Sequence, residues 1–267
     1  MITIKIEYPT QWKDYELIDS GEGQKLERFA SYTIVRTDPR ALWHKRAQDE
    51  WNNVKEPPTH PWNISYKHLT FLLRTTVFKH VGVFPEQAVN WDWVASRSSE
   101  LNILNLFAYT GGATLAAASS GARVTHVDSV KSTIAWAREN AQASGLGRAP
   151  IRWIEEDAYK YVLREGRRGN TYDAIIMDPP RFGRGSKGEV WKIEEDLPKL
   201  LDACKTILSP KPAFFLINAY TTDLSSLVLH HLMNDLFDKN MEFGELALKE
   251  STGGRLLPCG IFARWSR

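Results

Sequence analysis

Apolar runs alternate with amphipathic segments between residues 101 and 237. The apolar runs are short and bounded by turn residues, so they predict strands, whereas the amphipathic segments have helical spacing. The predicted strands are residues 101–107, 123–127, 151–154, 172–177 and 213–217. The predicted helices are residues 113–120, 131–144, 158–164, 194–208 and 224–237. Because strands that alternate with helices form a parallel sheet covered by helices, we expect an α/β fold.

Two further strands, residues 243–249 and 261–265, follow the last of these helices. The segment between them contains Gly253 and Gly254 and no helical pattern. It is too short for a parallel crossover, so the two strands are expected to pair antiparallel. The prediction is a doubly wound, Rossmann-like sheet that is mostly parallel, with the last strand antiparallel as a reversed edge strand.

The N-terminal part of the chain, residues 1–80, has a different pattern. Residues 19–23 are a turn signal, residues 25–36 alternate partly between apolar and polar positions, and residues 69–77 are another apolar run. These features indicate short antiparallel strands. We therefore expect a small β-rich N-terminal domain, followed by the α/β domain over residues 81–267.

The composition indicates an ordinary soluble globular protein, with 43% hydrophobic and 25% charged residues among 267. No leader and no membrane-spanning stretch is visible, so a cytoplasmic location is expected. The formal net charge of +2 is too small to indicate a nucleic-acid partner by itself. Cys204 and Cys259 are the only cysteines, and they predict neither a disulfide framework nor a metal site.

Ten tryptophans are many for a chain of this length, and most of them lie in its first part. Packing in the core of a small domain is the simpler interpretation. Exposed tryptophans would instead offer surfaces for base stacking.

Three predicted strands end where ligands bind in open α/β sheets, outside the carboxyl ends of the strands. The strand at 101–107 runs into a turn that contains Gly111 and Gly112, and two later strands end on Asp128 and Asp178. The turn lacks both the G-x-G-x-x-G pattern of dinucleotide-binding proteins and a phosphate loop. It is therefore poorly suited to a pyrophosphate and better suited to a cofactor without phosphate.

Two acidic residues in this region have two interpretations each. Asp128 lies about 20 residues past the turn, where a carboxylate accepts hydrogen bonds from ribose hydroxyls. It can also cap the helix that begins near Val130. Asp157 can meet an adenine amine or cap the next helix. A ribose and an adenine without a pyrophosphate indicate S-adenosylmethionine rather than NAD.

Several segments together resemble the ordered motifs of class I methyltransferases, and more narrowly the bacterial 23S ribosomal RNA methyltransferase I family with its uncharacterised relatives. These segments are residues 105–112, 128–129, 157–158 and 178–183. Residues 82–87 are similar to the segment just before that family's first motif, and residues 183–191 are typical of a subgroup of it. The resemblance covers residues 15–267.

The resemblance implies S-adenosylmethionine as the cofactor. The cofactor-binding residues that it implies are Gln87, Phe107, Ala108, Tyr109, Thr110, Gly111, Asp128, Ser129, Asp157, Ala158 and Asp178. Residues 107–111 would line the methionine part and Gln87 the amino-acid end. Asp128 would hold the ribose, and Asp157 with Ala158 the adenine.

The acceptor is expected at the turn formed by Asp178, Pro179 and Pro180, with Phe182 beside it. The enzyme's main task there is to align an in-line transfer. Arg181 stands where nitrogen methyltransferases of this kind have an aromatic residue. The match to the amine pattern is therefore imperfect.

Carbon-5 methylation of cytosine, the best-known chemistry of the family, needs a thiolate nucleophile. Neither strand end where that thiol is expected carries a cysteine, and Cys204 and Cys259 are interpreted as structural. Nitrogen or oxygen methylation is therefore expected. Asn218 and Tyr220 are candidate acceptor contacts, or ordinary polar residues at a strand end.

The predicted substrate is a base in RNA, expected to be ribosomal and either single-stranded or flipped into the pocket. The glycine-rich basic loop at 181–188 suits a phosphate backbone, and Arg164, Arg167 and Arg168 add a second basic cluster. Both can equally be solvated surface. The alternatives are a methyltransferase acting on a protein or small molecule, and a non-catalytic RNA-binding relative. A homodimer is considered as an assembly.

Overall fold

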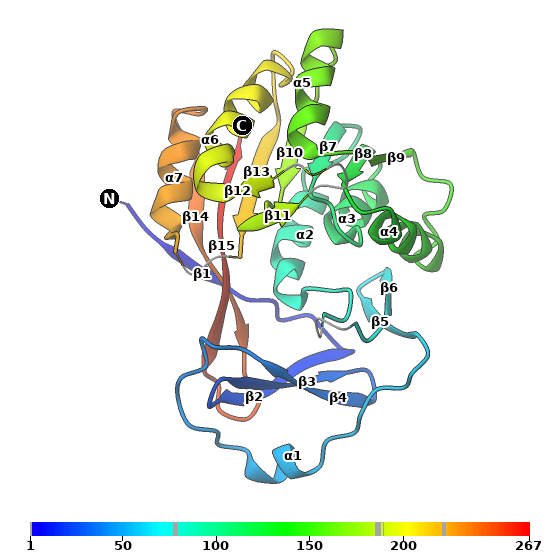
Figure 1. The fold of residues 1–267 in the computed structure, drawn as a ribbon, viewed down its shortest axis with the longest axis vertical. Helices are drawn as coiled ribbons and strands as arrows, with labels where there is room; N and C mark the ends of the chain where they lie inside the picture. The colour runs from blue at the N-terminus through cyan, green and yellow to red at the C-terminus, as the bar shows by residue number, and fades with distance from the viewer. Residues whose placement is uncertain (1, 77–79, 185–187, 189, 221–222) are drawn as a thin grey trace.

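A large central sheet organises the computed structural model, which describes residues 2–76, 80–184, 188, 190–220 and 223–267. Eight strands of the described chain form this sheet in the order β1-β14-β15-β13-β10-β7-β8-β9 (Figure 1). Its parallel part consists of β7 (Asn102–Leu106), β8 (Arg123–Asp128), β9 (Ile151–Glu155), β10 (Ala174–Met177) and β13 (Phe214–Ala219). The predicted α/β fold with a mostly parallel sheet is confirmed.

The reversed strand does not lie at the edge of the sheet, so that part of the prediction was wrong. β15 (Leu256–Ser266) is antiparallel to both of its neighbours, β13 and β14 (Met241–Lys249). Most of β15 is buried, which suits a strand that is hydrogen-bonded on both sides. The edge is instead formed by β1 (Lys5–Glu7), which pairs in parallel with β14.

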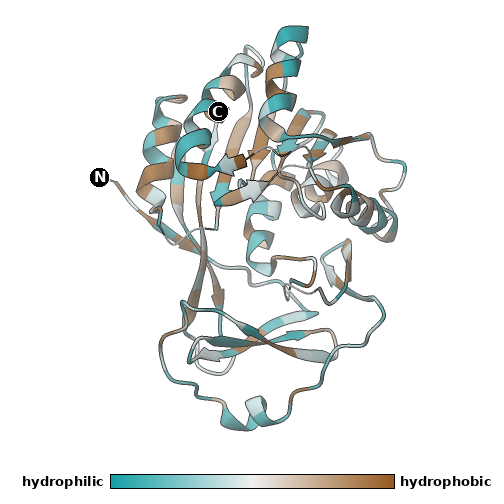
Figure 2. Cartoon of the chain, viewed as in Figure 1, coloured by the Kyte–Doolittle hydropathy of each residue, from teal (hydrophilic) through white to brown (hydrophobic). Residues whose placement is uncertain are grey.

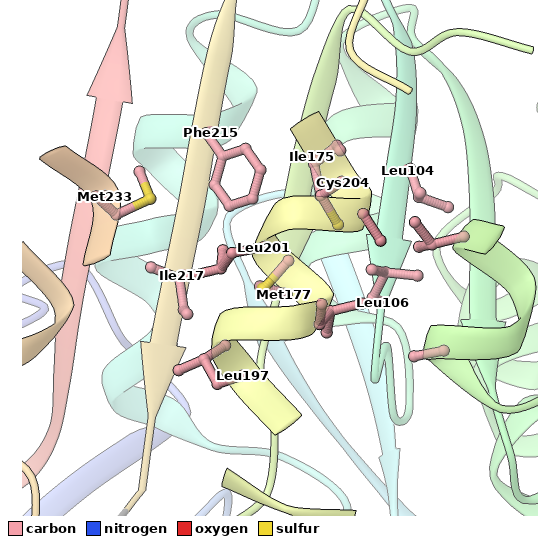
Figure 3. Packing of buried hydrophobic residues seen from close by; sticks show 14 of the residues in the cluster. Leu104, Leu106, Ile175, Met177, Leu197, Leu201, Cys204, Phe215, Ile217 and Met233 are labelled. Carbon is pink, nitrogen blue, oxygen red and sulfur yellow. The ribbon is translucent and has the colours of Figure 1, made fainter. Parts of the chain in front are cut away.

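Helices cover both faces of the sheet, because successive side chains of each strand point to opposite faces. Leu104 and Leu106 pack into a cluster with α5 (Ala158–Arg168), α6 (Ile193–Thr206) and α7 (Ser226–Asn234). Figure 3 shows Leu197, Leu201 and Cys204 of α6 lying over β10 in this cluster. Ile103 packs on the other face with α2 (Ala88–Ala95) and α3 (Gly112–Ser119). α4 (Lys131–Ala143) packs against β8 and β9.

The N-terminal part is rich in antiparallel strands, as predicted. β2 (Tyr15–Gly21), β3 (Gln24–Phe29) and β4 (Tyr32–Thr37) form one sheet, and β5 (Trp62–Tyr66) with β6 (Leu69–Leu73) forms a hairpin. The short helix α1 (Gln48–Asn52) lies between them in the chain. Residues 77–79, next to the expected boundary at residue 80, lie outside the described residues, and the two-domain division stays a prediction.

The hairpin of β14 and β15 extends from the main sheet to the N-terminal sheet (Figure 1). Ser251 donates its backbone N–H to Leu17 O at 2.9 Å. Arg255 pairs with the buried carboxylates of Asp19, at 2.8 Å, and Glu250, at 2.7 Å. Because a buried charge is costly unless it is paired, these contacts bind the two regions together.

The tryptophans fill interior space rather than the surface, since each of the ten is buried or half-buried. Trp91 packs with Phe71 and Leu115 in a cluster that joins the N-terminal hairpin to α2 and α3. Its indole leaves no room for a side chain at Gly112, where a Cβ atom would lie 2.6 Å from the ring. The core interpretation of these residues is therefore supported over base stacking.

A small hairpin of β11 (Phe182–Arg184) and β12 (Val190–Lys192) follows β10. Residues 185–187 and 189 of the predicted basic loop lie outside the described residues. Figure 2 shows hydrophilic and hydrophobic residues alternating around α4, α5 and α6, as expected of helices with one face on a sheet. In the part of the chain that the structure describes, no helix is long and apolar enough to cross a membrane.

Candidate cofactor and acceptor cleft

A cleft opens at the carboxyl ends of β7, β10 and β13, between these strands and the segment that leads into α2. Its lining joins some of the expected site residues to apolar side chains from distant parts of the chain. The lining residues are Phe71, Val83, Phe84, Gln87, Trp91, Asn105, Phe107, Ala108, Tyr109, Thr110, Gly111, Gly112, Ala113, Ile176, Asp178 and Asn218. The cleft thus lies at the carboxyl edge of the sheet, where the sequence predicts the site, and the roles of its residues stay a prediction.

The turn after β7 has an unusual backbone. Phe107, Tyr109 and Gly111 have φ angles of +54°, +49° and +91°. The left-handed region is unfavourable for residues other than glycine, and such strain tends to occur at functional sites. The turn is held by the Ala108 N–H, which donates to Val127 O at 3.1 Å, and by Thr110 Oγ1, which donates to Gly82 O at 2.6 Å.

Asp128 at the end of β8 supports the same turn. Its Oδ2 accepts the backbone N–H of Tyr109 at 2.9 Å, and its Oδ1 accepts that of Val130 at 2.9 Å. Burial raises the pKa of this carboxyl, while the hydrogen bonds from the backbone oppose the shift. Val130 itself is the N-cap of α4, so Asp128 braces the turn before the helix rather than capping it. Each oxygen keeps acceptor capacity for a hydroxyl.

A buried polar network lies beneath the turn. Asn105 Nδ2 donates to Thr114 Oγ1 at 2.9 Å, and Thr114 Oγ1 lies 2.9 Å from His126 Nδ1. Burial lowers the pKa of His126 to about 3, so the imidazole is neutral at physiological pH. The network therefore supports the floor of the cleft without placing a charge there.

Asp178 lines the cleft beside Asn218. Their strands are neighbours, with Met177 paired to Ile217 immediately before them. Burial, together with the nearby carboxylate of Glu86, raises the pKa of Asp178 to about 7, although a hydrogen bond from the Asn218 side chain opposes the shift. The Asn218 side chain is buried, and its amide lies beside the Asp178 carboxyl group.

Gln87 connects the cleft wall to Tyr220. Its Nε2 donates to the Tyr220 hydroxyl at 2.9 Å, and its Oε1 accepts from Asn90 Nδ2 at 2.9 Å. The Phe84 ring lies 5.1 Å from the Tyr220 ring and 5.5 Å from the Tyr109 ring. These contacts place an aromatic wall beside the acceptor end.

Not every expected residue lines the cleft. Asp157 caps α5 by accepting the Lys160 N–H at 2.9 Å, and Ala158 is buried in the core. Ser129 is half-buried next to Asp128. Pro179 is buried and Pro180 is exposed. The adenine contact expected of Asp157 and Ala158 stays a prediction, as do the roles of these other residues.

The side chains that follow the prolines are exposed. Phe182 is 53% exposed on β11. Arg181 forms ion pairs with Asp223 and, at 3.9 Å, with Glu194. α5 begins at the edge of the sheet where the cleft opens and runs to the opposite edge (Figure 1). The basic cluster at residues 164–168 lies towards the end of this helix.

Sequence reasoning missed several residues of the lining. Phe71, Phe84 and Trp91 come from segments that looked like ordinary core, and only the tertiary packing brings them to the cleft. Asn105 had a visible signal, because it is a polar residue inside an apolar strand, where a buried amide needs partners.

Comparison with known proteins identifies the family of the chain. The model of the S-adenosylmethionine-dependent methyltransferase family matches residues 25–231. The chain belongs to this family. A crystal structure of the SAM-dependent methyltransferase from Agrobacterium tumefaciens is similar with 42% identity and a TM-score of 0.93, covering 98% of this chain and 93% of that one. A structure of SMU.776 complexed with SAH shares the fold, with 18% identity, a TM-score of 0.76, and coverage of 96% and 76%.

Curated relatives match over shorter segments. The ribosomal RNA large subunit methyltransferase K/L of Shewanella frigidimarina is 33% identical over 52% of this chain and 20% of its own length. The ribosomal RNA large subunit methyltransferase I of Aeromonas salmonicida is 30% identical over 56% of this chain and 35% of its own length. The chain thus spans about a fifth to a third of these two relatives.

The residues of the cleft fit S-adenosylmethionine, the cofactor of the family. The carboxylate of Asp128 offers free acceptor capacity at the end of β8, where ribose hydroxyls bind. Ala108 and Gly111 of the left-handed turn line the cleft with backbone and small side chains, so no large side chain fills the cleft at these two positions. The cofactor supplies an electrophilic methyl group on sulfur, so the protein has to bind it and align an acceptor.

Proposed function

We propose that this protein transfers the methyl group of S-adenosylmethionine to a base in RNA, with ribosomal RNA as the expected source. The observation that carries the proposal is the acceptor end of the cleft. There Asp178, whose pKa burial raises to about 7, lines the cleft beside the buried amide of Asn218. The curated relatives, which are named as ribosomal RNA large subunit methyltransferases, support RNA as the substrate class.

Under this proposal the residues divide into two groups. Gln87, residues 107–111 and Asp128 bind the cofactor, as the resemblance implies. Asp178 and its neighbours Pro179 and Pro180 position the acceptor. A base inside a duplex cannot reach a cleft at a sheet edge, so it has to be single-stranded or flipped out.

A cysteine nucleophile is not part of the proposal. Cys204 lies in α6 among apolar residues (Figure 3), and Cys259 is buried in β15. Burial raises the pKa of both thiols, which disfavours the thiolate. Neither belongs to the described lining of the cleft. Nitrogen or oxygen is therefore the proposed methylated atom.

The test is transfer from isotopically labelled S-adenosylmethionine to RNA. Purified protein is incubated with labelled cofactor and ribosomal RNA transcribed in vitro, which carries no modifications. Label in the RNA supports the proposal. Label only in protein or in small molecules added as acceptors would contradict it. Binding of both RNA and cofactor without transfer would favour a non-catalytic RNA-binding relative.

A further inference from the structure

Trp191 is the buried residue of the hairpin that β11 and β12 form. Val190 and Lys192 on either side of it are exposed, whereas Trp191 itself is 8% exposed. It belongs to the same core cluster as Ile193 and Leu197 of α6. The indole is therefore anchored in the core of the domain, although the hairpin that carries it lies at the surface.

The indole N–H binds the turn that follows β10. Trp191 Nε1 donates to the carbonyl oxygen of Pro180 at 2.6 Å. Pro179 and Pro180 have no N–H groups, so the turn lacks two of the backbone donors that usually fix a turn in place. The third backbone donor of this segment, the Asp178 N–H, reaches Leu106 O only at 3.4 Å. The position of the turn therefore depends in large part on the indole.

The indole ring contacts the turn that follows β7. The centroids of the Trp191 and Phe107 rings lie 5.1 Å apart, and their planes are inclined at 59°. Phe107 is the first residue of this turn, has a φ angle of +54° and lines the cleft. Because a left-handed conformation is unfavourable for phenylalanine, its surroundings have to maintain it, and the indole is part of those surroundings.

The two turns leave neighbouring strands side by side. Leu106 pairs with Met177 at the carboxyl ends of β7 and β10. Beyond this pair the turns are no longer joined as a sheet, and the single indole of Trp191 contacts both, one through its ring and the other through its N–H. Trp191 thus sets how the two turns lie relative to each other. In-line methyl transfer is sensitive to that geometry, because the acceptor has to lie opposite the leaving sulfur.

We propose that Trp191 is a positioning residue for methyl transfer, which sets the acceptor turn at residues 178–180 against the cofactor turn at residues 107–111. This inference rests on the proposed function in one respect, since it takes the turn at 178–180 as the place of the acceptor. Trp191 does not belong to the described lining of the cleft, so it acts through Pro180 and Phe107. Its contribution is to the rate of the transfer step more than to binding.

Replacement of Trp191 by phenylalanine tests the contact with the acceptor turn. The variant keeps an aromatic ring in the core and removes the N–H. The hairpin keeps a second link to the chain after β10, since the Ile193 N–H donates to Arg181 O at 3.0 Å. We expect kcat for methyl transfer to fall by about 10- to 100-fold, because a small misplacement of a reacting group costs that much. The Kd for S-adenosylmethionine should stay within about twofold. A kcat within twofold of the wild type would overturn the inference.

Replacement of Trp191 by leucine tests the contact with the cofactor turn. This variant removes the aromatic partner of Phe107 as well as the N–H. We expect it to lower kcat as Trp191→Phe does and, in addition, to weaken S-adenosylmethionine binding by about three- to tenfold, the size of an aromatic pair. Calorimetry measures this affinity. An affinity equal to that of Trp191→Phe would refute a contribution of the ring to the cofactor turn.

Trp43→Phe is the matched control. Trp43 Nε1 also donates to a backbone carbonyl, that of Ser20 at 2.8 Å, but in the N-terminal sheet. This variant should lose stability as Trp191→Phe does and keep kcat within about twofold of the wild type. An equal fall of kcat in the two variants would show a general effect of lost stability and would overturn the positioning role.

The titration of Asp178 tests the role without an RNA acceptor. Burial and the nearby carboxylate of Glu86 raise the pKa of Asp178 to about 7. A turn that has lost the indole N–H is less firmly packed and admits water, so the pKa of Asp178 in Trp191→Phe should fall towards the usual range of aspartate.

NMR of carbon-13-labelled carboxyl groups, with the Asp178 signal assigned from Asp178→Asn, measures this pKa. An unchanged pKa in the folded Trp191→Phe protein would overturn the inference, whichever acceptor the protein methylates. Absence of transfer from the wild type to RNA would overturn the proposed function instead, and the titration would still decide whether Trp191 positions the turn.

Discussion

Replacement of Asp128 by asparagine tests the cofactor cleft most sharply among single substitutions. In the native turn both carboxylate oxygens accept backbone N–H groups, from Tyr109 at 2.9 Å and from Val130 at 2.9 Å. Asparagine has almost the same shape but one acceptor oxygen, so its NH2 group faces one of these donors. An unsatisfied buried donor costs about 1–3 kcal/mol.

The same substitution removes a charge-assisted hydrogen bond to the ribose. Hydrogen bonds to charged groups contribute about 1.5–3 kcal/mol, which is roughly 10- to 100-fold in Kd. We therefore expect Asp128→Asn to weaken S-adenosylmethionine binding by that factor and to lower the free energy of unfolding by about 1–3 kcal/mol. Isothermal titration calorimetry measures the first effect and urea denaturation the second.

Asp173→Asn is the control for this experiment. Asp173 Oδ2 also accepts a backbone N–H, from Asn102 at 2.9 Å, but at the amino end of the sheet. This variant should lose stability without losing cofactor affinity. A folded Asp128→Asn protein that binds S-adenosylmethionine within twofold of the wild type would refute the ribose assignment.

Three further predictions follow from the site. The rate of methyl transfer should rise with pH through about 7 as Asp178 ionises, and Asp178→Asn should remove this inflection. A pH–rate profile of the wild type that is flat from about 6 to 8 would count against a role of the Asp178 carboxylate in the transfer. Folding raises the pKa of Asp178 to about 7, so between about pH 4 and 7 the folded protein keeps a proton on this carboxyl that the unfolded chain has released. The free energy of unfolding therefore falls as the pH rises through that window. Asp178→Asn should accordingly raise Tm at pH 8 but not at pH 4, as calorimetry would show. Replacing both cysteines by alanine should leave the rate of methyl transfer within about twofold of the wild type and lower the free energy of unfolding by about 1–3 kcal/mol. Loss of methyl transfer in a folded variant would instead indicate a mechanism that uses a thiol.

The periodicity of the chain was enough to predict the parallel sheet, because five short apolar runs alternate with amphipathic helices. The same signal could not place β15, since its antiparallel pairing with both neighbours depends on which strands come together in space. β1 was missed because a three-residue edge strand has no period to detect. The ion pairs of Arg255 with Asp19 and Glu250 join segments that are far apart in sequence, so no local pattern indicates them.

The residues of the candidate site that could be predicted from the sequence are those that directly follow a strand. Asp128, Asp178 and the turn at 107–111 follow strands, and the structure brings the turn and Asp178 to one cleft with Asp128 against the turn. The aromatic wall at Phe84 was not predictable, because its role depends on packing against Tyr109 and Tyr220. The hydrogen bond from Gln87 to Tyr220 likewise joins segments that only the folded chain brings together.

A structure of the protein with S-adenosylhomocysteine tests the central claim most directly. We predict that the product binds between the turn at 107–111 and Asp178, with its ribose hydroxyls within hydrogen-bond distance of Asp128. A hollow at the opposite edge of the sheet, lined in part by Arg123, Arg152 and Asn170, offers a different position. Binding there, or anywhere away from Asp128, would contradict the cofactor site proposed above.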